Sequence, residues 1–388
     1  MNYKQDCIYF LSDRPCKFHK DNASVVCANC KFYKPVNKKI LVIKLAAIGD
    51  VVRTTCILKP IHTRWKNSKL TWITEDNAVE VLYNNSYINE VIPLSQSFLL
   101  FSEKFDIMIN LDLDLDALRL TRNIFAKQIY GFYLDGDNRI LCSNDAAKQW
   151  FDLSHNDLLK KKNQKTYQQY LMEILEFKDL SSSEYPIIIK LTDEEKLFAK
   201  NFIEPYVSNN EKSKKFVFVG INLGGGDKWE KKEYPVPQTV ELMKLIASSK
   251  NYVGKEIKIL LFGGVKEEQR NKKIITLFTA RYPLLSTKII DTGCNNTLRQ
   301  FFSLVNLCDV VITSDSLALH IALALKKKVV VLFGPTSANE IELYGLGTKI
   351  VSNKSCVVCY RRNCDKKPDC METITPVRVY HELLKILK

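Results

Sequence analysis

The stretch that decides the fold is Lys39-Ile-Leu-Val-Ile-Lys44, which is followed by the turn Ala46-Ala-Ile-Gly-Asp50. The first segment is a short aliphatic and β-branched run, as in a strand buried on both faces of a parallel sheet. The turn leads at its glycine into an apolar-periodic segment, Val51 to Trp65, which is typical of a helix. Strand, glycine turn and helix predict a first βα unit.

The alternation of strands and helices continues along the chain and restarts at Phe216-Val-Phe-Val-Gly-Ile-Asn222. Two successive series of parallel βα units predict an α/β protein with two Rossmann-like domains and a ligand in the cleft between them, at the carboxyl ends of the strands. The further expected strands are 70–74, 90–93, 105–111, 256–262, 289–291, 310–313 and 329–333. The further expected helices are 78–83, 116–126, 166–175, 193–202, 239–248, 267–281, 297–306 and 317–325.

Length and composition agree with this organisation. The chain has 388 residues, of which 46% are hydrophobic and 26% charged. This length exceeds the size at which one core stops growing, and the composition excludes disordered, collagen-like and coiled-coil proteins. No basic segment followed by an apolar stretch opens the sequence, and the longest apolar runs are far too short to span a membrane. We therefore expect a cytoplasmic protein.

The net charge of +14 and the twelve cysteines are unevenly distributed. Residues 1–39 and residues 345–388 each carry a positive excess of five, whereas residues 40–344 carry an excess of four. Eight cysteines follow the same division. The sequence thus predicts two basic, cysteine-bearing extensions around a nearly neutral body. These eight are Cys7, Cys16, Cys27, Cys30, Cys356, Cys359, Cys364 and Cys370.

Asp50 follows the glycine turn at the mouth of the first predicted strand. An aspartate at this point can cap the following helix through its carboxylate. The same position can also aim a general base into the cleft. The local pattern leaves both interpretations open.

Three glycines, residues 224–226, follow the strand 216–222 and precede Lys231 and Lys232. Glycine lets the backbone approach a ligand closely and present N–H groups to an anion, and lysines can reach the same phosphate. The segment is neither a P-loop nor a G-x-G-x-x-G motif. It indicates a phosphate site or a flexible surface loop.

A third segment, Thr313-Ser-Asp-Ser-Leu-Ala-Leu-His320, passes from strand to helix. Ser314, Asp315 or Ser316 could cap that helix, whose free N–H groups and positive dipole end suit a phosphate. His320 could contact a ligand or be an ordinary core histidine.

A fourth segment, Phe333-Gly-Pro-Thr336, turns after an apolar strand, and its threonine could bond a ligand or cap a helix. In this order and at these separations, the four segments resemble glycosyltransferase family nine, the ADP-heptose:lipopolysaccharide heptosyltransferases of the GT-B two-Rossmann fold. The resemblance covers about residues 39–350. It is carried by residues 40–50, 105–111, 224–235, 261–264, 313–322 and 332–336.

The resemblance implies roles for individual residues. Asp50 matches the catalytic base that deprotonates the acceptor hydroxyl, which attacks the anomeric carbon with inversion. Lys232 matches the lysine that binds the donor phosphates, and Asp315 matches the carboxylate that contacts the donor sugar. No metal or other cofactor is required for this step. The further donor-binding positions are Ser316, Leu317 and Ala318, whose backbone receives the pyrophosphate, with His320, Gly224, Gly225 and Thr336.

The same resemblance implies the domain functions and the substrates. Residues 39–180 would form the acceptor domain and residues 181–350 the nucleotide-sugar donor domain. An extension (1–38) and a cysteine-rich segment with a C-terminal helix (351–388) flank them. The implied donor is a nucleotide-diphosphate sugar, ADP-heptose, and the implied acceptor is a lipopolysaccharide core or similar glycan. Because such an acceptor lies on an anionic glycolipid, the basic ends predict peripheral association with the inner membrane.

Three positions depart from the family pattern. Ala46 stands where a serine is common, Ser316-Leu317 where Thr-Gly is frequent, and Tyr234 where tryptophan is usual. We expect Tyr234 to keep an aromatic wall at the donor site.

The eight terminal cysteines form two sets, each with a C-x2-C pair whose spacing suits zinc or an iron–sulfur cluster. Clustered cysteines in a cytoplasmic chain favour metal ligation over disulfides, although reduced structural cysteines remain an alternative. His19 is a conceivable substitute ligand. Spacing does not decide between one shared site and two. The four remaining cysteines, Cys56, Cys142, Cys294 and Cys308, are expected to be small core residues.

Two rival functions remain open. The first is a nucleic-acid-binding protein in which zinc ribbons and basic residues contact phosphate, while Phe32, Tyr33 and Tyr360 stack on bases. It would leave the central four-segment match unexplained. The second is a non-catalytic sugar-nucleotide sensor on the same fold, against which the presence of Asp50 argues. The basic residues of the first alternative are Lys31, Lys34, Lys38, Lys39, Arg361, Arg362, Lys366 and Lys367.

Overall fold

A computed structural model describes residues 3–207, 216–225, 230–249, 255–361 and 363–388. The chain forms two compact units, the first from residues 1–149 and 170–185 and the second from residues 150–169 and 186–388. Each unit is built on one six-stranded sheet. The prediction of two Rossmann-like α/β domains is confirmed.

The sheet of the first unit has the strand order β3-β2-β1-β4-β5-β6. All neighbouring strands are parallel except β6, which runs antiparallel to β5. The side chains of residues 40–43, in the central strand β1, are fully buried, as expected for a strand covered on both faces. The strands are β1 (Lys38–Ile43), β2 (Ser68–Thr74), β3 (Glu90–Pro93), β4 (Lys104–Asn110), β5 (Phe125–Leu134) and β6 (Ile140–Cys142).

The helices of the first unit differ in part from the predicted ones. The predicted helix over 51–65 is divided into α2 (Ile48–Thr54), the 3-10 helix η2 (Thr55–Ile57) and α3 (Leu58–Arg64). The predicted helix over 78–83 is also a 3-10 helix, η3 (Asp76–Leu82). Helix α4 (Leu115–Asn123) ends before the predicted residue 126 because β5 starts at Phe125 and pairs with β4. The other short helices are α1 (Lys17–Asp21), η1 (Cys27–Asn29), η4 (Leu94–Leu100) and η5 (Ser182–Glu184).

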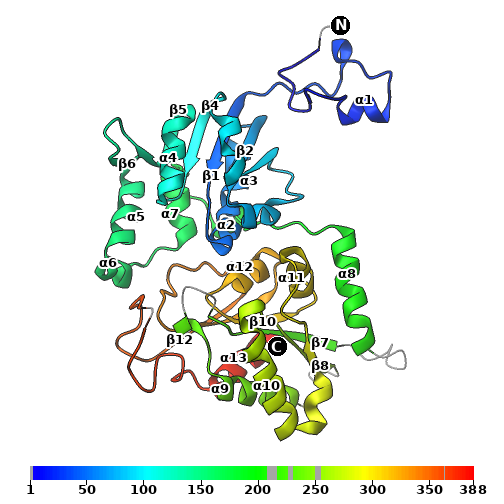
Figure 1. Cartoon of the computed structure of the whole chain (residues 1–388), viewed down its shortest axis with the longest axis vertical. Coiled ribbons are helices and arrows are strands. Elements are labelled where there is room, and N and C mark those ends of the chain that lie inside the picture. Colours follow the sequence, from blue (N-terminus) through cyan, green and yellow to red (C-terminus); the bar gives the residue numbers. More distant parts are fainter. Residues whose placement is uncertain (1–2, 208–215, 226–229, 250–254, 362) are drawn as a thin grey trace. The chain divides into compact units, whose positions relative to one another are not determined.

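The second unit has the strand order β12-β11-β10-β7-β8-β9, and all its strands are parallel. Figure 1 shows α11 and α12 on one side of this sheet and α9, α10 and α13 on the other. The strands are β7 (Phe216–Asn222), β8 (Glu256–Leu261), β9 (Ile289–Asp291), β10 (Val310–Ser314), β11 (Lys328–Phe333) and β12 (Gly347–Val351). The helices are α6 (Asp157–Lys162), α8 (Asp193–Ile203), η6 (Glu204–Tyr206), η8 (Glu230–Lys232), α9 (Val236–Ala247), η9 (Val265–Glu267), α10 (Glu268–Arg281), η10 (Pro283–Lys288), α11 (Leu298–Val305), α12 (Leu317–Ala324) and α13 (Pro376–Leu387).

Residues 150–169 group with the second unit, which the predicted boundary at 180/181 did not anticipate. The amide of Tyr167 donates to the carbonyl of Glu340 (3.0 Å), and the side chain of Asn339 donates to the carbonyl of Asn163 (3.0 Å). These long-range bonds fix the segment to the second unit. The chain passes between the units within α5 (Asp145–His155), within α7 (Tyr167–Ile174) and again after residue 185.

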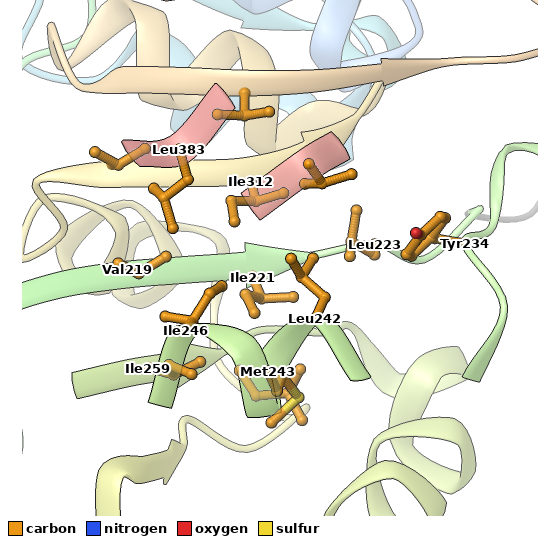
Figure 2. Close-up of a cluster of buried hydrophobic side chains, with 14 of the residues drawn as sticks. Val219, Ile221, Leu223, Tyr234, Leu242, Met243, Ile246, Ile259, Ile312 and Leu383 are labelled. Atoms are coloured by element: carbon orange, nitrogen blue, oxygen red, sulfur yellow. The ribbon is translucent and has the colours of Figure 1, made fainter. Parts of the chain in front are cut away.

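The C-terminal segment belongs to the core of the second unit and is not an appended extension. Met371, Ile374, Val379 and Leu383 are fully or almost fully buried. Figure 2 shows Leu383 in one apolar cluster with Ile312 of β10. The sequence prediction of a flanking extension here was wrong, because the apolar face of α13 completes the cover of the sheet.

The N-terminal extension has a small aromatic centre of its own. The rings of Phe18 and Phe32 stack at 4.0 Å, and Tyr9 meets Phe18 edge-on. The backbones of Cys7 and Pro35 form an isolated antiparallel β-bridge. Within the described part of the chain, no helix is both long enough and apolar enough to cross a membrane.

Truncation of Leu383 tests whether α13 completes the second unit. Leu383→Ala removes a fully buried side chain, so we expect the unfolding free energy of this unit to fall by about 3 kcal/mol. The measurement is urea denaturation. Val377→Ala, on the same helix but half exposed, is the matched control and should have little effect. Equal effects of the two substitutions would contradict the packing.

Candidate donor site

The centre of the candidate site is an ion pair between Lys232 and Asp315. The Lys232 Nζ atom lies 2.8 Å from Asp315 Oδ2 and also donates to the Asp315 backbone carbonyl at 3.0 Å. Both side chains are mostly buried, with 13% and 15% of their surface exposed. Lys232 ends η8, after β7, and Asp315 follows β10 directly. The sheet topology therefore unites two segments that the sequence predicted separately.

Two further predicted segments meet the same carboxylate and its neighbours. The Thr336 hydroxyl, which follows β11, donates to Asp315 Oδ2 at 2.8 Å. The Ser314 hydroxyl donates to the Gly224 carbonyl at 3.0 Å. Because β7, β10 and β11 are neighbours, their carboxyl ends lie side by side. This is the sheet edge at which ligands bind in doubly wound folds.

The charge of Asp315 is set by opposing effects. Burial favours the neutral carboxyl and by itself would raise its pKa. The Lys232 ammonium, His320 and the hydrogen bond from Thr336 outweigh burial and hold the pKa of Asp315 well below its usual range. Asp315 is therefore ionised at neutral pH.

Helix α12 begins next to this pair. Its N-cap residue is Ser316, whose side chain accepts no hydrogen bond from the first turn of the helix. The Ser316 hydroxyl instead bonds the Thr313 hydroxyl at 3.0 Å. The capping interpretation of this segment is therefore wrong. The Leu319 N–H bonds the carbonyl of the N-cap residue Ser316. Leu317 and Ala318 lie before that bond, so their N–H groups have no acceptor within the helix and form its positive dipole end.

His320 lies one turn into the same helix and is buried, with 5% of its surface exposed. Its electrostatic interaction with Asp315 helps to lower the pKa of that carboxyl. The structure thus places the predicted histidine within range of the predicted carboxylate.

The glycine loop begins with Gly224, which is packed tightly. A Cβ atom added there would lie 2.7 Å from Cγ of Glu267. Gly224 therefore allows close packing against η9, while Gly225 is half-buried. Residues 226–229 of this segment lie outside the described residues.

Tyr234 corrects one sequence expectation. Its ring is fully buried in the apolar cluster of the second unit, beside Leu223 in Figure 2. Its hydroxyl donates to the Ile374 carbonyl at 2.7 Å, and burial raises the pKa of the phenol. Tyr234 therefore joins α13 to the core and does not form a wall of the donor site.

Asp50 lies in the first turn of α2, in the first unit. The N-cap residue is Ala47, so the interpretation of Asp50 as the helix cap is wrong. The Asp50 carboxylate is 36% exposed and lies 2.8 Å from the Arg53 guanidinium, one turn later. A carboxylate held at a helix start by an arginine remains accessible to a second molecule.

Two residues that sequence reasoning missed organise the loop before Asp50. Asp112 pairs with Lys44 at 2.9 Å and accepts from the backbone amide of Leu45 at 2.8 Å. Both charged side chains are largely buried. The only sequence signal was an aspartate directly after the predicted strand 105–111.

Tyr360, from the cysteine-rich segment, supports the loop that carries Thr336. Its amide donates to the Pro335 carbonyl at 3.0 Å. Its hydroxyl accepts from the Ser337 amide at 3.3 Å and donates to Glu340 at 2.9 Å. The sequence offered Tyr360 as a base-stacking residue, but the structure uses it inside the second unit.

The other two residues proposed to stack on bases are engaged within the N-terminal extension. Phe32 stacks on Phe18, and the Tyr33 hydroxyl bonds the Asp6 carboxylate. Arg362 lies outside the described residues. All three aromatic residues that the nucleic-acid alternative assigns to base stacking thus have contacts within the chain, which gives that alternative no support.

The cysteine sets differ in their surroundings. All eight terminal cysteines are free and half-buried. Cys16 occupies the N-cap position of α1 without a capping bond from its side chain, Cys27 starts η1 and Cys30 directly follows it. The His19 ring bonds the Val25 carbonyl at 2.9 Å. The C-terminal four line one cavity. As the side chains stand, no three His, Cys, Asp or Glu residues in the described ranges are arranged to hold a metal ion.

Three of the other four cysteines have the buried environment expected of core residues. Cys56, Cys294 and Cys308 are buried, whereas Cys142, at the end of β6, is half-buried.

A family model described as "Glycosyltransferase family 9 (heptosyltransferase)" matches residues 99–369. The chain belongs to glycosyltransferase family 9. Lipopolysaccharide heptosyltransferase 1 of Campylobacter coli is 24% identical over 368 residues, which cover 90% of this chain and 98% of that relative. The resemblance inferred from the four segments is thereby confirmed, and with it the prediction of a glycosyltransferase.

Several solved structures share the fold. A family 9 glycosyltransferase from Veillonella parvula has a TM-score of 0.70 at 18% identity, and covers 91% of this chain and 98% of its own. The ADP-heptose lipopolysaccharide heptosyltransferase II of E. coli has a TM-score of 0.64 at 18% identity, with coverages of 90% and 98%. An iron-containing dodecameric glycosyltransferase of enterotoxigenic E. coli has a TM-score of 0.53 at 12% identity, with coverages of 90% and 79%.

The state of Asp315 predicts a pH dependence of stability. Asp315→Asn leaves the Lys232 ammonium buried without its counter-charge. We therefore expect the free energy of unfolding at pH 7 to fall by about 3 kcal/mol. Because the folded-state pKa of Asp315 lies below the unfolded value of about 3.9, the wild-type advantage is fully present above about pH 5 and declines below about pH 4. Urea denaturation of both proteins at pH 7, 5 and 3 measures this difference in unfolding free energy.

Asp193→Asn is the control for this experiment. Asp193 also pairs with a lysine, Lys196, but its side chain is exposed, so its replacement should leave stability unchanged. A wild-type advantage over Asp315→Asn that stays constant down to pH 3 would contradict the ionised pair.

Proposed function

We propose that the protein is an inverting heptosyltransferase that moves heptose from ADP-heptose to a lipopolysaccharide core or similar glycan. The observation that carries the donor half of this proposal is the meeting of Lys232, Asp315 and the start of α12 at one sheet edge. Family membership supports the reaction class. The names of the relatives support the choice of donor and acceptor.

The chemistry of the donor half follows from charge. When the bond to the anomeric carbon breaks, the departing nucleoside diphosphate gains negative charge. The Lys232 ammonium and the first-turn N–H groups of α12 are preorganised donors that stabilise this charge. Asp315 holds Lys232 in place and offers its carboxylate to sugar hydroxyls. This step requires no metal ion.

Asp50 is the proposed general base. Its carboxylate would take the proton of the acceptor hydroxyl as that oxygen attacks the anomeric carbon from the face opposite the leaving group. Arg53 fixes the orientation of the carboxylate through the ion pair at 2.8 Å. Asp112 and Lys44 hold the preceding loop, so the carboxylate is presented from a supported turn.

The acceptor class gives a role to the basic ends of the chain. Residues 1–39 and 345–388 together carry most of the net charge of +14. Lysines and arginines near an anionic leaflet gain roughly 1 kcal/mol each from its surface potential. Peripheral association with an anionic inner-membrane surface is therefore part of the proposal.

Asp50→Ala tests the proposed catalytic role. Loss of a general base should lower the transfer rate by about 10²- to 10⁴-fold, while ADP-heptose binding stays within twofold of wild type. Transfer to purified lipopolysaccharide core and calorimetric titration of the donor are the two measurements. Transfer that survives Asp50→Ala would remove Asp50 from the mechanism.

Asp116→Ala is the matched control, because Asp116 also lies in the first turn of a helix and pairs with the arginine three residues later (3.4 Å). It should leave transfer unchanged. A wild-type protein that binds ADP-heptose but transfers nothing would favour the sensor alternative. Stronger thermal stabilisation by a uridine or guanosine sugar than by ADP-heptose would contradict the donor assignment.

A further inference from the structure

The four C-terminal cysteines line a single small cavity. Sequence spacing alone left open whether they share a site, but Cys356, Cys359, Cys364 and Cys370 all border one space of about 20 Å³. This volume is close to that of one water-sized sphere. We propose that this cavity binds one divalent metal ion, zinc or ferrous iron, through the four thiolates, and that the ion fastens the donor loop 334–337.

The ligand set suits such an ion. Four cysteines with a C-x2-C pair are the usual tetrahedral environment of structural zinc, with metal–sulfur distances of about 2.3 Å. Iron also accepts four sulfur ligands. All four thiols are free and half-buried, and none is committed to a disulfide. As the side chains stand, the four thiols do not form a ligand group. The proposal therefore requires them to rotate between their staggered positions when the ion binds.

The neighbourhood fixes the position of one ligand. A Cβ atom added to Gly334 would lie 2.6 Å from the Cys370 Sγ atom. The absence of a side chain at Gly334 is therefore what lets this thiol lie against the backbone of the donor loop. Met371, the next residue, is buried in the core of the second unit and anchors this side of the cavity.

The charges around the cavity favour a thiolate centre. A divalent ion with four thiolates carries a net charge of −2, and four cations border the same space against a single carboxylate, that of Asp369. Such outer groups stabilise the ligands and tune the metal. The four cations are Lys231, Lys354, Arg361 and Lys366.

The donor loop 334–337 also forms part of the wall of this cavity. Gly334 and Pro335 border it, and Thr336, the next residue, donates to Asp315. Tyr360, which follows Cys359, binds the loop at Pro335 and Ser337. An ion that fixes Cys359 and Cys370 therefore restrains both sides of the loop. This coupling rests on the proposed donor function of Asp315, whereas metal binding itself does not.

The first experiment measures metal content. Protein purified under reducing conditions without added metal is analysed for zinc and iron as wild type and as the Cys359→Ser/Cys364→Ser variant. We expect the variant to hold one ion fewer per chain. Cys142→Ser, which replaces a half-buried cysteine of the first unit, should match wild type. Equal metal content in all three proteins would overturn the proposed site.

A second measurement guards against misfolding of the variant. Wild-type protein stripped with a chelator is titrated with Co²⁺, and four thiolate ligands should give intense sulfur-to-cobalt charge transfer together with tetrahedral ligand-field bands. Addition of Zn²⁺ should abolish both signals. Octahedral cobalt without sulfur charge transfer, in protein whose circular dichroism is unchanged, would overturn the proposed ligand set.

ADP affinity measures the coupling between metal binding and the donor loop. We expect the stripped wild-type protein to bind ADP about tenfold more weakly than the zinc-reloaded protein. Equal ADP affinity would overturn the coupling and leave the metal site standing. Failure of even the metal-loaded protein to bind ADP would contradict the proposed donor function and not the metal site, so the two failures are distinguishable.

Discussion

The ion pair between Lys232 and Asp315 joins segments that lie 83 residues apart in the sequence. Neither charge would be stable in this mostly buried position alone, because removal of one partner leaves an uncompensated charge. Each partner is therefore held where its own strand ends, Lys232 after β7 and Asp315 after β10. The positions of Thr336, of the start of α12 and of the supporting loop 334–337 all follow from this constraint.

A chain of contacts also links the pair to the end of the chain. Thr336 reaches Asp315 from a loop that Tyr360 braces, and Tyr360 belongs to the cysteine-rich segment. That segment continues into α13, whose apolar face is part of the core. In the sequence this region was marked by its charge, its cysteines and a predicted C-terminal helix. In the structure it is part of the unit that holds the candidate donor site.

The sequence was a good guide where the signal is local. Aliphatic runs such as 40–43 and 329–333 predicted buried strands because parallel strands are covered on both faces. Strand β5 was missed, since the exposed polar residues Lys127 and Gln128 interrupt its apolar run. Strand β12, at the edge of its sheet, was missed for the same reason, because only one of its five residues is buried.

The site shows the same limit. The four segments were visible because each follows a predicted strand, and parallel topology brings such ends together. Tyr234, Asp112 and Tyr360 could not be assigned, because their roles depend on partners in other elements: the Ile374 carbonyl, Lys44 and the Ser337 amide. The common cavity of the C-terminal cysteines is likewise a product of the folded segment and not of its spacing.

The central claim is that the diphosphate of the donor lies at the Lys232–Asp315 pair and the start of α12. Hydrogen–deuterium exchange with and without ADP tests it most directly, because it locates the ligand on the backbone. The account predicts the strongest protection in residues 230–234, 314–320 and 334–337, with little change in residues 283–288, which include the exposed Leu284. Protection confined to the first unit, or spread evenly over the second, would contradict it.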